Sequence, residues 1–141
     1  MRFTLTAAVV AVMMSASTVA QTSVRDGAWW DQQSAMARTS YATGVLEGIR
    51  VGLFAILAKM PGKVTDPNAN AAIEAYLSFE RDYVRTVTGQ QLADALTELY
   101  NNPQNTGLAV SDTVQVALLK IGGTPASLIE ETLRDLRQKK K

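Results

Sequence analysis

Cysteine and histidine are both absent from the 141 residues of the chain. Without cysteine no disulfide bridge can form, so the fold must be stabilised by packing alone. Without either residue, catalysis by a thiolate or by a histidine-activated serine is excluded. Most zinc sites are excluded as well, since their ligands are thiolate or imidazole groups. Carboxylate chemistry is the remaining route to catalysis.

Two pairs of carboxylates have a spacing that places both members on one side of a helix. Asp94 and Glu98 form one pair, and Glu131 and Asp135 form the other. Both pairs lie among solvent-facing positions, where nothing tunes their protonation for acid or base catalysis. We therefore expect that the chain is not an enzyme, and that it has no catalytic residue, no metal site and no cofactor.

An excess of charge of either sign is also lacking. The 14 Lys and Arg residues nearly balance the 13 Asp and Glu residues, so the formal net charge is +1. Arg2 is the only charged residue before position 21, and the rest of the chain is formally neutral. Nucleic-acid binding needs a basic surface that displaces counterions from phosphates, so we expect no nucleic-acid partner.

The first twenty residues have the pattern of a cleavable signal peptide. Arg2 supplies the positive start, Leu5–Met14 is almost entirely apolar, and small residues lead up to Ala20. The alternative is a membrane anchor, but the apolar run is about half of the roughly 20 residues that a spanning helix requires. We expect cleavage near Ala20 and, in a bacterium, a periplasmic protein. With no cysteine to carry a lipid, no membrane anchor remains after cleavage.

Residues 21–25 then form a short polar lead, residues 26–138 a single helical domain, and residues 139–141 a basic tail. Apolar residues recur at three and four residue steps along most of the domain, and no strand pattern competes with them. We expect an all-α fold, a compact bundle of five or six helices around a central glycine-rich helix. The helices are expected near residues 26–30, 33–60, 67–86, 89–100, 111–121 and 126–138.

Local capping sequences mark several of the expected helix starts. Asp26 can accept hydrogen bonds from the first free backbone N–H groups of the first helix. Thr88 and Gln91 match a capping box, in which a hydroxyl and an amide each satisfy a backbone donor. Ser111 can cap the helix that follows the polar loop 101–107.

The most distinctive local pattern is a row of glycines on the central helix. Gly44, Gly48 and Gly52 follow Tyr41 at four-residue steps and lie nearly in line along one side. Each glycine costs a helix up to about 1 kcal/mol relative to alanine. We expect that a second helix of the same fold crosses closely at this row. The alternative is that the row forms a groove or a dimer seam on the surface.

The first helix carries two adjacent tryptophans, Trp29 and Trp30. Neighbouring helical residues point about 100° apart, so the two rings cannot fill one pocket. We expect that one packs in the core and that the other lies at its rim, with Trp30 as the candidate for an apolar contact with a partner.

Two stretches together resemble the small helical proteins of the type VI secretion amidase immunity family. They are Ser40–Gly48, and Val87–Tyr100 leading through Asn102-Pro103 to Val114–Leu118. The resemblance implies a periplasmic helical domain, often dimeric, that binds a toxic peptidoglycan amidase and blocks its active site without any catalysis of its own. The chain departs from this family because it lacks the cysteines that many members carry. The Asp26-Gly27 and Trp29 segment also resembles related exported proteins of unknown role.

These observations predict an exported, non-enzymatic binding protein of the periplasm, an immunity-like inhibitor of a peptidoglycan-targeting effector. The partner is then a protein, a cognate amidase effector, and a homodimer is a further option. Loops on rigid scaffolds commonly carry recognition, so the candidate contacts are Asn101, Asn102, Gln104 and Asn105. The alternative function is a periplasmic chaperone or stress-response protein that uses an exposed tryptophan.

Overall fold

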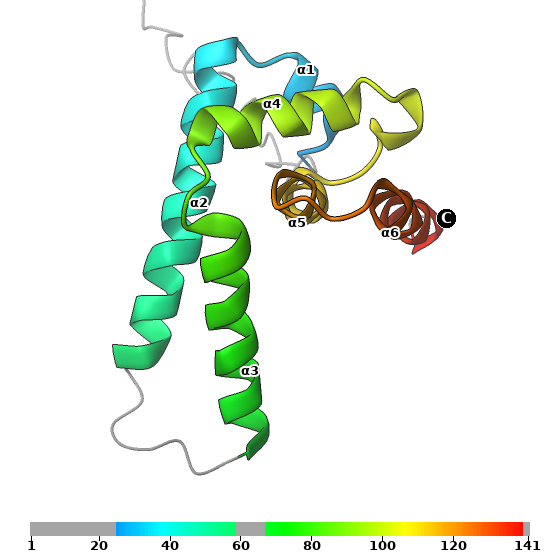
Figure 1. The fold of residues 1–141 in the computed structure, drawn as a ribbon. Coiled ribbons are helices and arrows are strands. Elements are labelled where there is room, and N and C mark those ends of the chain that lie inside the picture. The colour runs from blue at the N-terminus through cyan, green and yellow to red at the C-terminus, as the bar shows by residue number, and fades with distance from the viewer. Residues whose placement is uncertain (1–24, 59–66, 140–141) are drawn as a thin grey trace, which may run out of the picture.

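The computed structural model describes residues 25–58 and 67–139. The predicted signal peptide, most of the polar lead and the end of the basic tail lie outside these residues. The described chain is all-α, as the sequence predicts. Its elements, shown in Figure 1, are α1 (Gly27–Asp31), α2 (Ala35–Ala58), α3 (Pro67–Phe79), the π-helical turn η1 (Glu80–Val84), α4 (Gly89–Tyr100), the 3-10 turn η2 (Pro103–Asn105), α5 (Val110–Ile121) and α6 (Ala126–Lys139).

The helices form a body and an arm. In Figure 1, α4 crosses the upper part of α2, with α5 and α6 beside it, and the lower part of α2 runs alongside α3 away from them. We use "arm" for α3 together with residues 49–58 of α2. The Tyr76 hydroxyl joins the two sides of the arm by donating to the Ile49 carbonyl over 2.8 Å.

Arg50 ties the base of the arm to the body. Its guanidinium donates to the backbone carbonyls of Val84 and Val87 at 3.1 and 3.2 Å. These carbonyls lie at and just beyond the end of η1, where helical hydrogen bonding runs out. Arg50 also pairs with Glu47 at 2.6 Å. Arg50 therefore forms an ion pair within α2 and also satisfies carbonyls at the end of a neighbouring helix.

The core lies in the body, around α4. Half of α4 is buried, namely Leu92, Ala93, Ala95, Leu96, Leu99 and Tyr100. This helix packs against α1, α2 and α5, so the central place belongs to α4 and not to the glycine-rich α2. The expectation of a central glycine-rich helix is wrong because α2 turns one apolar side into the core and leaves the other exposed.

Two of the three predicted caps are confirmed. Asp26 accepts from Trp29 N at 3.1 Å, and Thr88 and Gln91 form the complete capping box. The prediction for Ser111 is wrong, because α5 begins one residue earlier and has no side-chain cap. The N–H of Val110 donates instead to the carbonyl of Arg25 at 2.7 Å, so a backbone group from the start of the body replaces the serine.

The glycine row faces away from the rest of the described chain. Apart from adjacent residues and the backbone of α2 itself, no described atom lies within 4 Å of where a Cβ would stand at Gly44, Gly48 or Gly52. The close helix crossing is made by Gly89 of α4, where a Cβ would collide with the Thr43 side chain. The expected internal crossing at the glycine row is therefore wrong for the described residues, since the glycine that permits the contact belongs to the other helix.

None of the helices in the described part of the chain is both long enough and apolar enough to cross a membrane.

Candidate functional site

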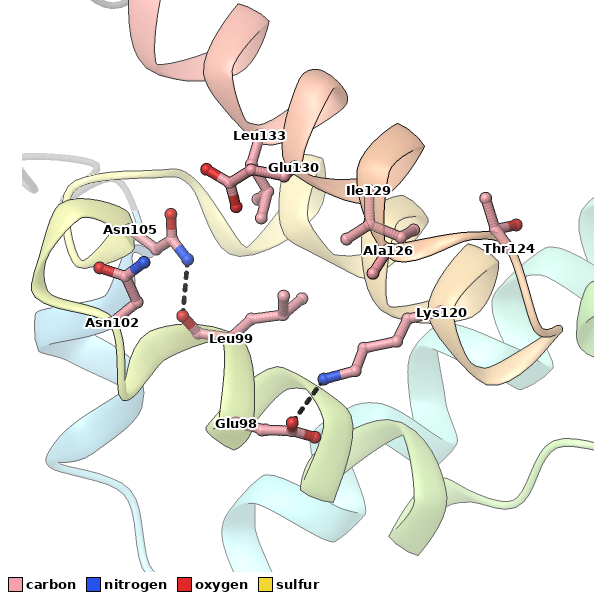
Figure 2. A pocket seen from close by; sticks show the side chains of 10 residues that line it. All are labelled: Glu98, Leu99, Asn102, Asn105, Lys120, Thr124, Ala126, Ile129, Glu130 and Leu133. Atoms are coloured by element: carbon pink, nitrogen blue, oxygen red, sulfur yellow. Dashed lines mark hydrogen bonds and ion pairs between the residues drawn. The ribbon is translucent and has the colours of Figure 1, made fainter.

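A groove lies where α4, the η2 loop and the two C-terminal helices meet, and Figure 2 shows it from close by. Its volume is about 430 Å³. We call it the α4–α6 groove. Its apolar part consists of Leu99 from α4 with Ala126, Ile129 and Leu133 from α6, and its polar part consists of Glu98, Asn102, Asn105, Lys120, Thr124 and Glu130.

Ion pairs hold charged side chains along the groove. Lys120 reaches from α5 to Glu98 on α4 with an N–O distance of 2.6 Å. Glu130 pairs at 2.8 Å with Arg137, about two turns further along α6. Glu98 and Glu130 therefore each have a cationic partner. The groove presents an apolar surface that is bordered by these ion pairs.

Asn105 fastens the loop beside the groove. Its side chain is 1% exposed, and its amide nitrogen donates to the Leu99 carbonyl at 2.7 Å. Its amide oxygen accepts from Arg137 Nη2 at 2.7 Å and from Arg137 Nε at 3.0 Å. The interpretation of Asn105 as a partner contact is wrong, because these bonds use the side chain to join η2 to α4 and α6.

The other three loop candidates lie at the surface. Asn101 ends α4, with its backbone N–H donating to the Thr97 carbonyl at 3.0 Å. Asn102 caps η2 by accepting from Gln104 N at 3.0 Å, and it also lines the groove. The structure therefore brings Asn102 and the buried Asn105 to one groove, while Asn101 and Gln104 lie in the same short loop.

Trp30 does not lie at this groove and is completely buried. Its indole N–H donates to Thr97 Oγ1 at 3.0 Å, and its ring packs edge-on against Tyr41. The candidate contact at Trp30 is therefore wrong, although the expected division of the pair is confirmed. Trp29 is the partly exposed ring, and the Arg25 guanidinium stands 5.2 Å from its centroid.

The carboxylate pairs have ordinary surface contacts. Asp94 accepts from the Gln90 amide at 2.8 Å, and Glu98 holds Lys120. Glu131 and Asp135 are exposed on α6. Across residues 25–58 and 67–139, no three side chains of the His, Cys, Asp and Glu types gather as metal ligands would.

One buried ionisable group is strongly perturbed. Burial raises the pKa of Tyr100 to about 12, although its 2.7 Å hydrogen bond with Thr113 acts in the opposite direction. The hydroxyl also donates to the Leu108 carbonyl at 3.1 Å. Tyr100 therefore stays protonated at neutral pH and holds α4, the following loop and α5 together.

The chain was compared with family models, curated proteins and solved structures, and none of the three comparisons found a match. The resemblance to the amidase immunity family therefore stays a prediction that rests on the residues quoted above.

Sequence reasoning missed the groove itself. Leu99, Ile129 and Leu133 belong to the apolar stripes of α4 and α6, and helical periodicity by itself places such stripes towards the interior. Periodicity identifies an apolar side of a helix, but it cannot distinguish a side that is fully covered from one that leaves a hollow between neighbours. The only sequence signal near the groove was the polar loop 101–107.

Proposed function

We propose that the chain is an exported, non-enzymatic binding protein of the periplasm that acts as an immunity-like inhibitor of a peptidoglycan-targeting effector. The observation that carries this proposal is the α4–α6 groove with its adjoining loop. An apolar floor bordered by polar side chains is the usual anatomy of a protein interface. A protruding apolar side chain of the effector would enter the groove, and the loop would contact the effector beside it.

The loop is prepared for binding before any partner arrives. Asn105, Arg137 and the Leu99 carbonyl hold η2 in one position through three hydrogen bonds. A surface that is already ordered loses less conformational entropy on binding. Asn101, Asn102 and Gln104 are exposed on this fixed loop and can therefore recognise a partner at low entropic cost.

Shape and apolar contact would dominate recognition in the groove. Glu98 and Glu130 already have cationic partners, so they offer no free charge to a polar small molecule. The likeness to amidase immunity proteins supplies the class of partner, a peptidoglycan amidase. Such an inhibitor needs only to cover the active site of the effector.

The test first reads the genes that flank this one, and it then uses any peptidoglycan amidase that they encode. The purified chain is mixed with that amidase, and the release of peptidoglycan fragments is measured. We expect inhibition near equimolar ratio. Ala126→Trp, at an exposed position on the groove, should fill the groove and weaken inhibition roughly tenfold or more. The matched control is Ala72→Trp, at an exposed position on α3, which should inhibit like the unmodified chain.

Circular dichroism of both variants checks that the fold is retained. Unchanged amidase activity in the presence of excess chain would refute the immunity-like function. Equal inhibition by both tryptophan variants would place the contact somewhere other than the groove.

The second candidate function, a periplasmic chaperone or stress-response protein, is favoured by a different observation. Three large apolar side chains on α2 are mostly exposed: Met36, Val51 and Phe54. Because Trp30 is buried, its replacement would unfold the body and would not test client binding. The informative experiment measures suppression of client aggregation by the chain and by Phe54→Ser, with lost suppression in the variant supporting a chaperone.

A further inference from the structure

A second hollow lies where α4 crosses the start of α2 (Figure 1). Its volume is about 270 Å³, and none of its lining residues lines the α4–α6 groove. We call it the polar cleft. Arg38 of α2 and Asp94 of α4 supply its two charges, and the short side chains of Ala35 and Ala93 leave its space open. The cleft therefore places a cation and an anion around one small cavity.

Neutral acceptors hold the Arg38 guanidinium at the cleft. Its Nε and Nη2 atoms donate to the carbonyls of Trp30 and Asp31 at 3.0 and 3.1 Å, and Nη1 donates to Thr97 Oγ1 at 3.4 Å. These bonds use three of the five N–H groups of a guanidinium, so two remain without an acceptor in the described chain. The Asp31 carboxylate stands 3.9 Å away and is 58% exposed, so it compensates the positive charge only weakly.

Asp94 is held by a neutral partner on the α4 wall of the cleft. Its Oδ1 atom accepts from the Gln90 amide at 2.8 Å, and the Gln90 amide oxygen lies 3.0 Å from the Thr39 hydroxyl oxygen. Its Oδ2 atom has no partner within the described residues. Across residues 25–58 and 67–139, Arg38 and Asp94 form no ion pair with each other. Both charges therefore line one cleft, and neither neutralises the other.

We propose that the polar cleft binds a small zwitterion of the aminocarboxylate class, with the ligand carboxylate on Arg38 and the ligand ammonium on Asp94. The two free N–H groups of Arg38 can donate to the carboxylate, and hydrogen bonds between charged groups are stronger than neutral ones. The free Oδ2 atom of Asp94 can accept from the ammonium. Asp94 would repel a simple anion and Arg38 a simple cation, so a molecule that carries both charges fits best.

The size and exposure of the cleft limit the ligand and its affinity. Pockets that hold drug-sized molecules start at about 300 Å³, so the occupant is smaller than such molecules. Asp94 is exposed, and ion pairs that are open to water are weak because the solvent screens them. Arg38 and Asp94 are already fixed in place, which lowers the entropic cost of binding. We expect a dissociation constant of about 1 mM.

Titration of the full purified chain, followed by NMR, tests the proposal. Three probes, glycine, β-alanine and 4-aminobutanoate, separate an ammonium from a carboxylate by increasing lengths, whereas acetate and methylammonium carry one charge each. One of the three aminocarboxylates should shift the backbone amide signals of Gln90 and Asp94 saturably and bind at least roughly tenfold tighter than acetate or methylammonium. Acetate that binds as tightly as every aminocarboxylate would overturn the proposal, and so would the absence of saturable shifts up to about 50 mM.

Two pairs of variants locate the bound ligand. Asp94→Asn should raise the dissociation constant of the tightest aminocarboxylate roughly tenfold without weakening acetate binding, whereas Glu131→Gln, at an exposed position on α6, should alter neither. Ala35→Leu should fill the cleft and abolish saturable binding, and Ala72→Leu is its exposed control on α3. Equal effects within either pair would overturn the proposal. Ala126→Trp should leave this binding unchanged, so failure of the proposed inhibitor function and failure of this site are distinguishable.

Discussion

At the scale of single residues, Asn105 shows that a side chain in a polar loop can belong to the core. Replacing it with alanine removes three buried hydrogen bonds, one to the Leu99 carbonyl and two from the Arg137 guanidinium. The carbonyl keeps only a 3.4 Å bond from Asn102 N, and the guanidinium keeps Glu130. Each lost hydrogen bond contributes about 0.5 to 1.5 kcal/mol. We expect Asn105→Ala to lower the free energy of unfolding by about 3 kcal/mol, measured by urea denaturation.

The control for this prediction is Asn101→Ala, four residues earlier in the same loop. Asn101 is exposed, and exposed substitutions usually change the free energy of unfolding by less than about 0.5 kcal/mol. Equal effects of the two substitutions would mean that the Asn105 hydrogen bonds contribute nothing measurable to stability.

Because Tyr100 is buried, the body loses stability at alkaline pH. Its pKa is about 12 in the folded chain, against an ordinary value of 10.0 that applies when the chain is unfolded. Because the folded state binds the proton more tightly, the stabilisation is complete below pH 10 and is lost as the pH rises to about 12. The loss amounts to roughly 2 to 3 kcal/mol.

The measurement is urea unfolding at several pH values for the native chain and for Tyr100→Phe. The variant is less stable at neutral pH, because the phenylalanine cannot bond Thr113 and Leu108. The difference between the two proteins should shrink between pH 10 and 12. If the free energies of unfolding of the two proteins change in parallel between pH 10 and 12, the raised pKa of Tyr100 is contradicted.

Residue-level predictions succeeded where the physical cause is local. The Thr88 and Gln91 capping box depends on a few neighbouring residues, and the structure forms it as expected. Which tryptophan enters the core depends on Thr97 and Tyr41, which lie on other helices, and periodicity within α1 cannot supply that information. Ser111 failed as a cap for the same reason, since a distant carbonyl took its place.

At the scale of elements, the glycines of α2 and α4 have opposite roles. Gly44 and Gly48 face open space, so alanine there should raise the free energy of unfolding by about 0.5 to 1 kcal/mol each through better helix propensity. A Cβ at Gly89 would lie only 3.0 Å from Thr43 Cβ and 3.1 Å from the Thr39 carbonyl oxygen. Gly89→Ala should therefore lower the free energy of unfolding by about 1 to 3 kcal/mol.

Thermal and urea unfolding of the three variants, at one fixed protein concentration, measure these changes. Gly44→Ala and Gly48→Ala serve as matched controls for Gly89→Ala, since all three add one methyl group. A loss of stability in Gly44→Ala would indicate that another part of the chain covers the glycine row.

The glycine spacing correctly singled out an unusual side of α2, but it could not say what lies against that side. A small residue allows close approach equally well within a fold and between two molecules. The deciding observation is where α4 crosses, and that depends on the position of Gly89 and on the length of the loop before it.

At the scale of the whole molecule, the all-α class followed from helical periodicity, because nearly every segment carries its own apolar stripe. The division into body and arm did not follow. It depends on where α3 packs, which is chiefly against η1, with Tyr76 bonded to α2. The weak apolar stripe of α3 has the same sequence pattern whether the helix is covered or exposed. A hollow of about 450 Å³ remains between Phe79 of the arm base and Val114 and Leu118 of α5.

The arm should open independently of the body. None of the residues of α3 is buried, whereas α4 buries six, so opening α3 exposes far less apolar surface. We expect the backbone amides of α3 to exchange with deuterium at least roughly tenfold faster than those of α4, as resolved by NMR or mass spectrometry. Tyr76→Phe removes the 2.8 Å bond to Ile49 and should speed exchange in α3 further, without changing α4.

The control is Tyr83→Phe, because among the described residues the Tyr83 hydroxyl has no hydrogen-bond partner, and its ring packs at Gly122 near the end of α5. This variant should leave exchange in α3 unchanged. Equal exchange in α3 and α4 would mean that arm and body unfold as one unit, with the arm stabilised by something other than its contacts within the chain.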